Sequence, residues 1–174
     1  MHDTQARLAK RSQMMYETLP IMLQHIVSQY GDNEVQLSKD DDGVFHPVTY
    51  RQFFSEVLTL AAGLHTLGVN RGSAVGLISD NRKEWLAADM AILSLGAADV
   101  PRGRDAMPYE LQFILRVTES AVCFAENTEQ ARKILALADG LPHLKQLIIM
   151  DTVHHLAEEL PETGTIEILA YQDV

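Results

Sequence analysis

Two arginines flank a glycine in the segment Pro101-Arg102-Gly103-Arg104-Asp105, and they are the strongest candidates in the chain for holding a ligand. The segment follows a short apolar stretch that is predicted to be a strand, so it would lie at the edge of a sheet where ligands bind. A guanidinium group can hold a phosphate or a carboxylate through paired hydrogen bonds. We therefore predict an anion contact at Arg102 and Arg104. The alternatives are a solvated loop and an ion pair with a part of the protein that lies outside these 174 residues.

A single aspartate, Asp80, follows the apolar run at residues 74–79. A carboxylate at the end of a buried strand could accept a phosphoryl group or bind a metal ion. Aspartate and asparagine are also preferred helix N-caps, and Glu84 would suit the first turn of a helix capped by Asp80 or Asn81. The cap is the favoured interpretation, and Trp85 is expected to pack against the protein rather than bind a ligand.

Three further groups of polar or reactive side chains carry weaker signals. The aspartates at 40–42 are consecutive and lack the spaced ligands of a calcium loop, which favours a solvated hairpin tip. His154 and His155 are adjacent rather than one helical turn apart, so they favour surface positions over a zinc site. Cys123, the only cysteine, has apolar neighbours and is predicted to be buried. A lone cysteine also excludes an intrachain disulfide.

Common catalytic and nucleotide-binding signatures are missing from the sequence. It contains no G-x-x-x-x-G-K-[ST] phosphate loop, no G-x-G-x-x-G fingerprint, no H-E-x-x-H, no C-x-x-C and no G-x-S-x-G. We therefore predict no catalytic residue, no metal site and no cofactor bound by these 174 residues alone.

Hydrophobic periodicity predicts the elements that would position these side chains. Helices are expected at about 19–31, 49–68, 82–95, 108–118 and 128–138, and strands at 34–38, 44–48, 74–79, 97–100, 121–125, 146–150 and 166–169. Strands that alternate with helices indicate an α/β fold with a doubly wound, mainly parallel sheet flanked by helices. The first two strands, around Asp42-Gly43, form a small N-terminal β-hairpin. One domain is predicted over 1–174, with N-terminal helices and the hairpin in 1–48 and the alternating β/α core in 49–174.

Composition narrows the range of partners. The chain is 47% hydrophobic and 22% charged, which is typical of a soluble globular domain. Its net charge is −10, and residues 105–174 hold 12 acidic against four basic residues, so nucleic acid is not expected as a partner. The basic and apolar residues at positions 7–16 could make a weak peripheral membrane contact, although a packed helix is favoured. No signal peptide is recognisable, and we predict a cytoplasmic protein.

Scattered short motifs together resemble the N-terminal region of AMP-forming acyl-CoA synthetases, and most of all the long-chain fatty acid–CoA ligases. No single motif is specific, but their order and spacing are, over about residues 15–174. The matching positions are Leu19-Pro20-Ile21-Met22-Leu23, Thr49-Tyr50, Ala62-Gly63-Leu64, Leu67-Gly68-Val69, Gly72, Ala74-Val75-Gly76-Leu77, Asn81-Arg82, Glu84-Trp85, Ala88-Asp89, Ala91-Ile92-Leu93, Gly96-Ala97, Val100-Pro101, Pro108-Tyr109-Glu110-Leu111, Ile114-Leu115 and Ser120-Ala121. The sequence departs from the family at Ser73, where Asp is common, and in the Arg102–Asp105 loop, where tyrosine and threonine are usual.

The resemblance implies a parent enzyme that joins a fatty acid to coenzyme A through an acyl-adenylate, with ATP and Mg²⁺. The matching residues are mainly scaffold. The family's phosphate-binding loop, adenylate motif, ribose-binding aspartate and mobile lysine would all follow Val174, so no catalytic residue carries over. The resemblance thus implies a truncated N-terminal subdomain, inactive alone, whose partners are the remainder of the parent ligase and its fatty acid substrate.

Two other functions stay open at this stage. One is a standalone phosphoacceptor signalling domain, for which Asp80 is the only support, since Lys145 precedes its strand rather than following one. The other is a protein-interaction module without a ligand. The chain ends shortly after an apolar strand that no helix follows, so we expect a bare sheet edge and self-association of the isolated chain.

Overall fold

The computed structural model describes residues 17–39, 42–151, 160 and 165–174. The predicted helix periodicities correspond to α2 (Leu19–Tyr30), α3 (Tyr50–Thr66), α4 (Lys83–Ser94), α5 (Pro108–Val117) and α6 (Thr128–Leu135). The predicted strands correspond to β1 (Glu34–Lys39), β2 (Phe45–Thr49), β3 (Ala74–Ile78), β4 (Ala98–Arg102), β5 (Val122–Ala125), β6 (Gln146–Ile149) and β7 (Glu167–Ala170). Short 3₁₀ turns add Ala138–Gly140 and Tyr171–Asp173. The α/β fold class is confirmed.

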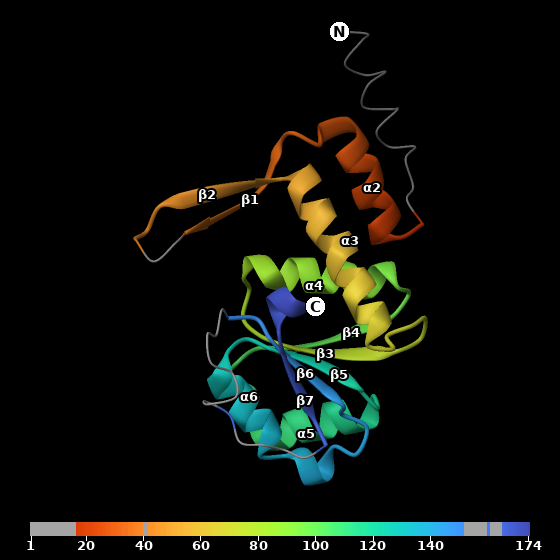
Figure 1. Ribbon diagram of the computed structural model, residues 1–174, viewed down its shortest axis with the longest axis vertical. Helices are drawn as coiled ribbons and strands as arrows, with labels where there is room; N and C mark the ends of the chain where they lie inside the picture. The colour runs from red at the N-terminus through yellow and green to blue at the C-terminus, as the bar shows by residue number, and fades with distance from the viewer. Residues whose placement is uncertain (1–16, 40–41, 152–159, 161–164) are drawn as a thin grey trace, which may run out of the picture.

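The N-terminal part consists of α2 and an antiparallel hairpin of β1 and β2, which extends away from the helices (Figure 1). Thr18 caps α2 by accepting a hydrogen bond from the Ile21 amide at 3.4 Å, and Gly31 ends the helix, as the sequence predicted. Gly43 follows Asp42 in the connection between the strands and has φ +79°, a conformation that glycine adopts without strain. The predicted hairpin is confirmed, while Asp40 and Asp41 lie outside the described residues.

Helix α3 has strong signals at both ends. The Gln52 amide donates to Thr49 Oγ1 at 3.3 Å, and the Thr49 amide donates back to Gln52 Oε1 at 2.9 Å, which is a capping box. At the other end Gly68 adopts φ +91°, the left-handed conformation that terminates many helices. Local signals in the sequence therefore define both ends of this helix.

The main sheet contains five parallel strands in the order β4-β3-β5-β6-β7. In sequence order, β3 is the first strand of this sheet. The next strand, β4, pairs with one side of β3, and β5 then pairs with its other side. The direction of winding therefore reverses between β3 and β5. In open α/β sheets, the crevice at the carboxyl ends of such strands is the usual binding place.

Helices cover both faces of the sheet, and each covered face has its own apolar core (Figure 1). On one face α3 and α4 pack against the strands, and α2 contacts both of these helices from outside. On the other face α5 and α6 pack over a second cluster that includes Leu111, Leu115, Ile134 and Leu147. None of the helices in the described part of the chain is long and apolar enough to cross a membrane.

The end of β4 differs from the sequence-based prediction. The strand was expected to stop at Val100, but Pro101 and Arg102 still pair in register with Leu77 and Ile78 of β3. Proline cannot donate a hydrogen bond to the ladder, yet β4 is an edge strand of this sheet and tolerates it there. Arg102 is therefore held on a strand rather than in a loop.

The residues after β7 pack back onto α3. The Tyr171 hydroxyl donates to Glu56 Oε1 at 2.8 Å, and a Cβ added to Gly63 would collide with the carbonyl of Val174. Gly63 thus permits the close approach of these two backbones. Burial, with the neighbouring charge of Glu56 adding to it, raises the pKa of Tyr171, so the hydroxyl stays protonated.

Candidate functional site

Polar side chains gather at the carboxyl ends of the parallel strands. Asp80 follows β3, Arg104 follows β4, Glu126 follows β5 and Asp151 follows β6. Parallel strands bring their carboxyl ends to one edge, so four loops that are far apart in sequence meet there. This edge is the candidate site.

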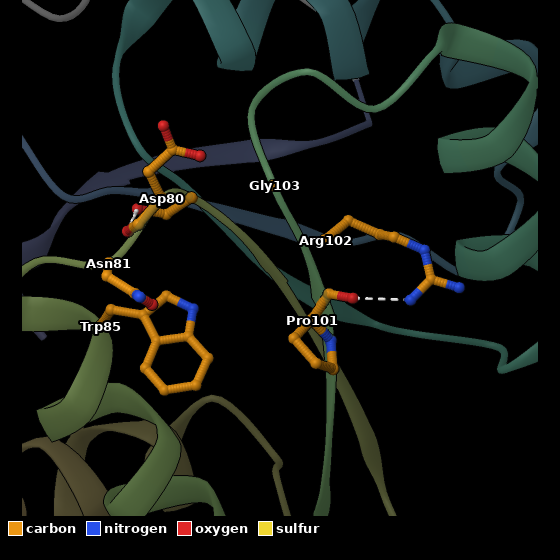
Figure 2. A pocket seen from close by; sticks show the side chains of 7 residues that line it. Asp80, Asn81, Trp85, Pro101, Arg102 and Gly103 are labelled. Carbon is orange, nitrogen blue, oxygen red and sulfur yellow. Dashed lines mark hydrogen bonds between the residues drawn. The ribbon is translucent and has the colours of Figure 1, made fainter.

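A hollow of about 570 Å³ opens at this edge (Figure 2). Its lining comes from three segments: Ser79, Asp80 and Asn81 after β3, Trp85 of α4, and Pro101, Arg102 and Gly103 at the end of β4. Trp85 and Pro101 supply flat apolar surfaces, and Arg102 supplies a guanidinium group. Trp85 also packs, half-buried, against the core on the α3–α4 face, as predicted.

The two predicted anion-binding arginines are placed differently. Arg102 lines the hollow, and its Nη1 donates to the carbonyl of Pro101 at 2.7 Å, with the side chain extending away from Asp80 (Figure 2). Arg104 forms an ion pair within the chain, with its Nε 2.9 Å from Asp80 Oδ2, which the sequence did not predict. It also lies 4.0 Å from Glu126 Oε1. An anion contact at these residues stays a prediction, and Arg102 has the more available guanidinium group.

The predicted role of Asp80 or Asn81 as a helix cap is wrong. The N-cap of α4 is Arg82, which makes no side-chain capping bond. Asp80 instead turns toward the β4–α5 loop, where its Oδ1 accepts a hydrogen bond from the Arg104 amide at 3.3 Å. Its carboxylate binds Arg104 through both main chain and side chain, so the phosphoacceptor alternative gains no support from the geometry.

Arg82 is a central residue of the edge that the sequence did not single out. Its Nε donates to Glu84 Oε2 at 2.7 Å, and its Nη1 donates to Asp151 Oδ1 at 2.5 Å. Nη1 also donates to the Glu126 carbonyl at 3.3 Å. Burial alone would lower the pKa of Arg82, but the hydrogen bonds with Glu84 and Asp151 outweigh it and raise the pKa. Arg82 therefore connects the start of α4 to the ends of β5 and β6.

Glu126 and Lys133 complete the edge. Glu126 Oε2 accepts hydrogen bonds from the Asp80 amide at 2.7 Å and from Ser79 Oγ at 3.3 Å. Lys133 of α6 donates from Nζ to the carbonyls of Arg104 at 2.8 Å and Ala106 at 3.3 Å. The position of Glu126 directly after a predicted strand could have marked it as an edge residue. The contact of Lys133 could not be foreseen, because its partners belong to a loop 27 and 29 positions earlier.

The remaining predicted candidates include Cys123 and the adjacent pair His154 and His155. Cys123 is fully buried in β5, as predicted, and burial raises the pKa of its thiol. His154 and His155 lie outside the described residues. Within the ranges that the structure describes, no three histidine, cysteine or carboxylate side chains form a group that could hold a metal ion.

Residues 23–169 match the family model of the AMP-binding enzymes. The match covers most of the chain, which therefore belongs to the AMP-binding enzyme family. The family membership agrees with the resemblance found in the sequence.

Sequence identity to individual curated proteins adds detail to the family match. The chain is 30% identical over 131 residues to a long-chain-fatty-acid–CoA ligase, ACSBG2, of Xenopus laevis. It is 32% identical over 124 residues to the long-chain-fatty-acid–CoA ligase FadD15 of Mycobacterium tuberculosis. These matches cover 75% and 71% of this chain but only 18% and 21% of the relatives. The chain thus spans about a fifth of their length.

Solved structures show the same fold. The A-PCP didomain of a carboxylic acid reductase from Segniliparus rugosus, solved with AMP, has a TM-score of 0.78 at 21% identity. The alignment covers 97% of this chain and 27% of that one. An anthranilate CoA ligase in complex with anthranoyl-AMP has a TM-score of 0.76 at 23% identity, over 94% of this chain and 28% of the other. At these identities, the likeness establishes the fold of the five-stranded sheet and its helices.

Proposed function

We propose that the chain is the N-terminal scaffold of an ATP-dependent long-chain fatty acid–CoA ligase. In the whole enzyme, the fatty acid carboxylate would attack ATP to form an acyl-adenylate and release pyrophosphate, and the thiol of coenzyme A would then displace AMP. The observation that carries this proposal is the family match over residues 23–169. The long-chain preference is supported by relatives with that name at 30% and 32% identity.

The described residues do not by themselves fit the triphosphate of ATP. Of the cations at the carboxyl edge other than Arg102, Arg82 is occupied by Glu84 and Asp151, and Arg104 by Asp80. Lys133 bonds to two carbonyls of the β4–α5 loop. ATP, Mg²⁺ and coenzyme A are therefore assigned to the complete ligase, and the 174-residue chain alone is proposed to be inactive.

The role proposed for this chain is to hold one wall of the ligase's substrate site. Asp80 and Lys133 fix the β4–α5 loop from two sides, through the amide and the carbonyl of Arg104. The loop in turn borders the hollow that contains Trp85 and Arg102. Arg102 is the residue proposed to contact a phosphate or carboxylate group of a substrate, because its guanidinium group has no carboxylate partner among the ion pairs of the described residues.

The test is an assay of the complete ligase with ATP, Mg²⁺, coenzyme A and acids of increasing chain length. We expect pyrophosphate release and acyl-CoA formation with palmitate, and at least tenfold lower kcat/KM with acetate. Activity confined to short or aromatic acids would contradict the long-chain assignment while leaving the family intact. Acyl transfer to a carrier protein instead of coenzyme A would contradict the proposed acceptor.

A further inference from the structure

Three large apolar side chains of α5 point to solvent in a single row. Tyr109, Phe113 and Val117 are 69%, 68% and 61% exposed. They are spaced four residues apart, so they lie on one face of the helix. We call these three residues the α5 stripe.

The stripe is not part of the core beneath the helix. Leu111 and Leu115, which are 0% and 1% exposed, supply the buried side of α5 and pack in the core on the α5–α6 face. The helix is therefore held by one face, while its opposite apolar face has no cover among the residues that the structure describes. Exposed aromatic residues in a row are unusual on a free surface and mark places of contact.

The charges around the stripe do not favour a membrane or a nucleic acid. Glu110 and Arg116 lie beside it, both exposed, and their charges are opposite. Anionic lipid or a phosphate backbone would require a basic border. The chemistry of the surface fits an apolar protein face.

The size of the stripe distinguishes between a separate partner and an attached one. Two aromatic side chains about two-thirds exposed, together with a valine, offer roughly 300 Å² of apolar area. A stable dimer needs about 800 Å² from each partner. A segment of the same polypeptide needs less area, because the link between them removes most of the entropy cost of association.

We propose that the α5 stripe is covered by an apolar surface of the polypeptide that follows residue 174 in the complete ligase. This inference rests on the proposed function, since the named relatives are about five times as long as this chain. The remainder of such a ligase is large and permanently attached. A second copy of the chain is the competing occupant, but the area of the stripe is too small for it.

Phe113→Cys and Val117→Cys provide the probes, because the native Cys123 is fully buried. Each variant is made in the 174-residue chain and in the complete ligase and is treated with a thiol reagent, and labelling at the substituted position is followed by peptide mass spectrometry. Rates are divided by those of Arg71→Cys, an exposed turn position, and by those in denaturant. Both substitutions replace exposed side chains, so they should not prevent folding.

We expect both positions to label at least tenfold more slowly in the complete ligase than in the 174-residue chain. Equal rates in a ligase that still forms acyl-CoA would overturn the inference and leave the proposed function standing. Equal rates in a protein without ligase activity would count against both. Slow labelling of the 174-residue chain that accelerates on dilution would show a second copy on the stripe and would also overturn the inference.

Discussion

The two faces of the sheet are covered in different ways. On the α3–α4 face, α2 contacts both helices from outside, and the C-terminal residues from Tyr171 to Val174 pack against the same core. On the α5–α6 face, the helices bury one side and leave Tyr109, Phe113 and Val117 exposed on α5. The first face has two layers of cover and the second has one.

This difference distinguishes apolar surface that the chain buries by itself from apolar surface that it leaves exposed for contact with other parts of a larger protein. Buried apolar area on the α3–α4 face is already in contact with other residues, so substitutions there should be costly in the isolated chain. The α5 stripe contributes little to the stability of the isolated chain, because its side chains stay about two-thirds exposed after folding. Substitutions can therefore measure how far the two faces differ.

The largest expected effect comes from a matched pair of truncations. Leu64→Ala removes a fully buried side chain from the α3–α4 core and should lower the free energy of unfolding by about 2–5 kcal/mol. Phe113→Ala removes a larger side chain from the α5 stripe but should change it by less than about 0.5 kcal/mol. Urea denaturation of both variants measures the difference. A cost for Phe113→Ala as large as that for Leu64→Ala would show that the stripe is already packed.

A smaller effect is expected where α4 joins the carboxyl edge. Arg82→Met removes the guanidinium group that binds Glu84 and Asp151, and Glu84 is buried, with a side chain only 12% exposed. The buried carboxylate of Glu84 then loses its ion pair with Arg82, which should lower the free energy of unfolding by about 1–3 kcal/mol. Arg102→Met is the control, since among the described residues the Arg102 side chain bonds only to the neighbouring carbonyl of Pro101, and its stability should be within about 0.5 kcal/mol of the parent chain. Equal stabilities of the two variants would contradict the role assigned to Arg82.

The smallest effect concerns a half-buried carboxylate of α4. Burial, with a smaller contribution from the charge of Asp99, raises the pKa of Asp89 to about 6. The folded state thus holds this proton more tightly than the unfolded state. Its contribution to stability is present below about pH 4 and is lost as the pH rises through about 6.

Asp89→Asn should therefore raise the free energy of unfolding by about 1–2 kcal/mol at pH 7, a value reduced from the full shift because solvent screens the group. Near pH 4 the variant and the parent chain should be almost equally stable. Urea denaturation at both pH values measures this change. A substitution that destabilises the chain at pH 7 would contradict the predicted sign.

Much of the fold could be predicted from the sequence, because its local signals agree with one another. Thr49 and Gln52 mark the start of α3, Gly68 marks its end, and the apolar run in β3 is typical of a strand buried on both faces. The end of β4 was missed because Pro101 normally interrupts a strand. Only the position of β4 at the edge of the sheet makes proline tolerable there, and the order of the strands is not encoded in their spacing.

The location of the candidate site could be predicted from the sequence, but the contacts within it could not. Parallel strands indicated where loops would meet, and the sequence correctly placed Asp80 and Arg102 there. It did not show that Asp80 binds Arg104 instead of capping α4, because the two residues are 24 positions apart. The contacts of Arg82 with Asp151 and of Lys133 with the β4–α5 loop have the same long-range character. Local propensity carries no information about such pairs.

The central claim is that this chain is a scaffold that takes part in acyl-CoA formation only within a complete ligase. The most direct measurement is pyrophosphate release by the purified 174-residue chain with ATP, Mg²⁺, palmitate and coenzyme A. We expect no release above a protein-free blank, because the cations at the carboxyl edge are largely taken up by internal contacts. The complete ligase, assayed in parallel, should show palmitate-dependent release. Sustained, palmitate-dependent release by the isolated chain would contradict the claim.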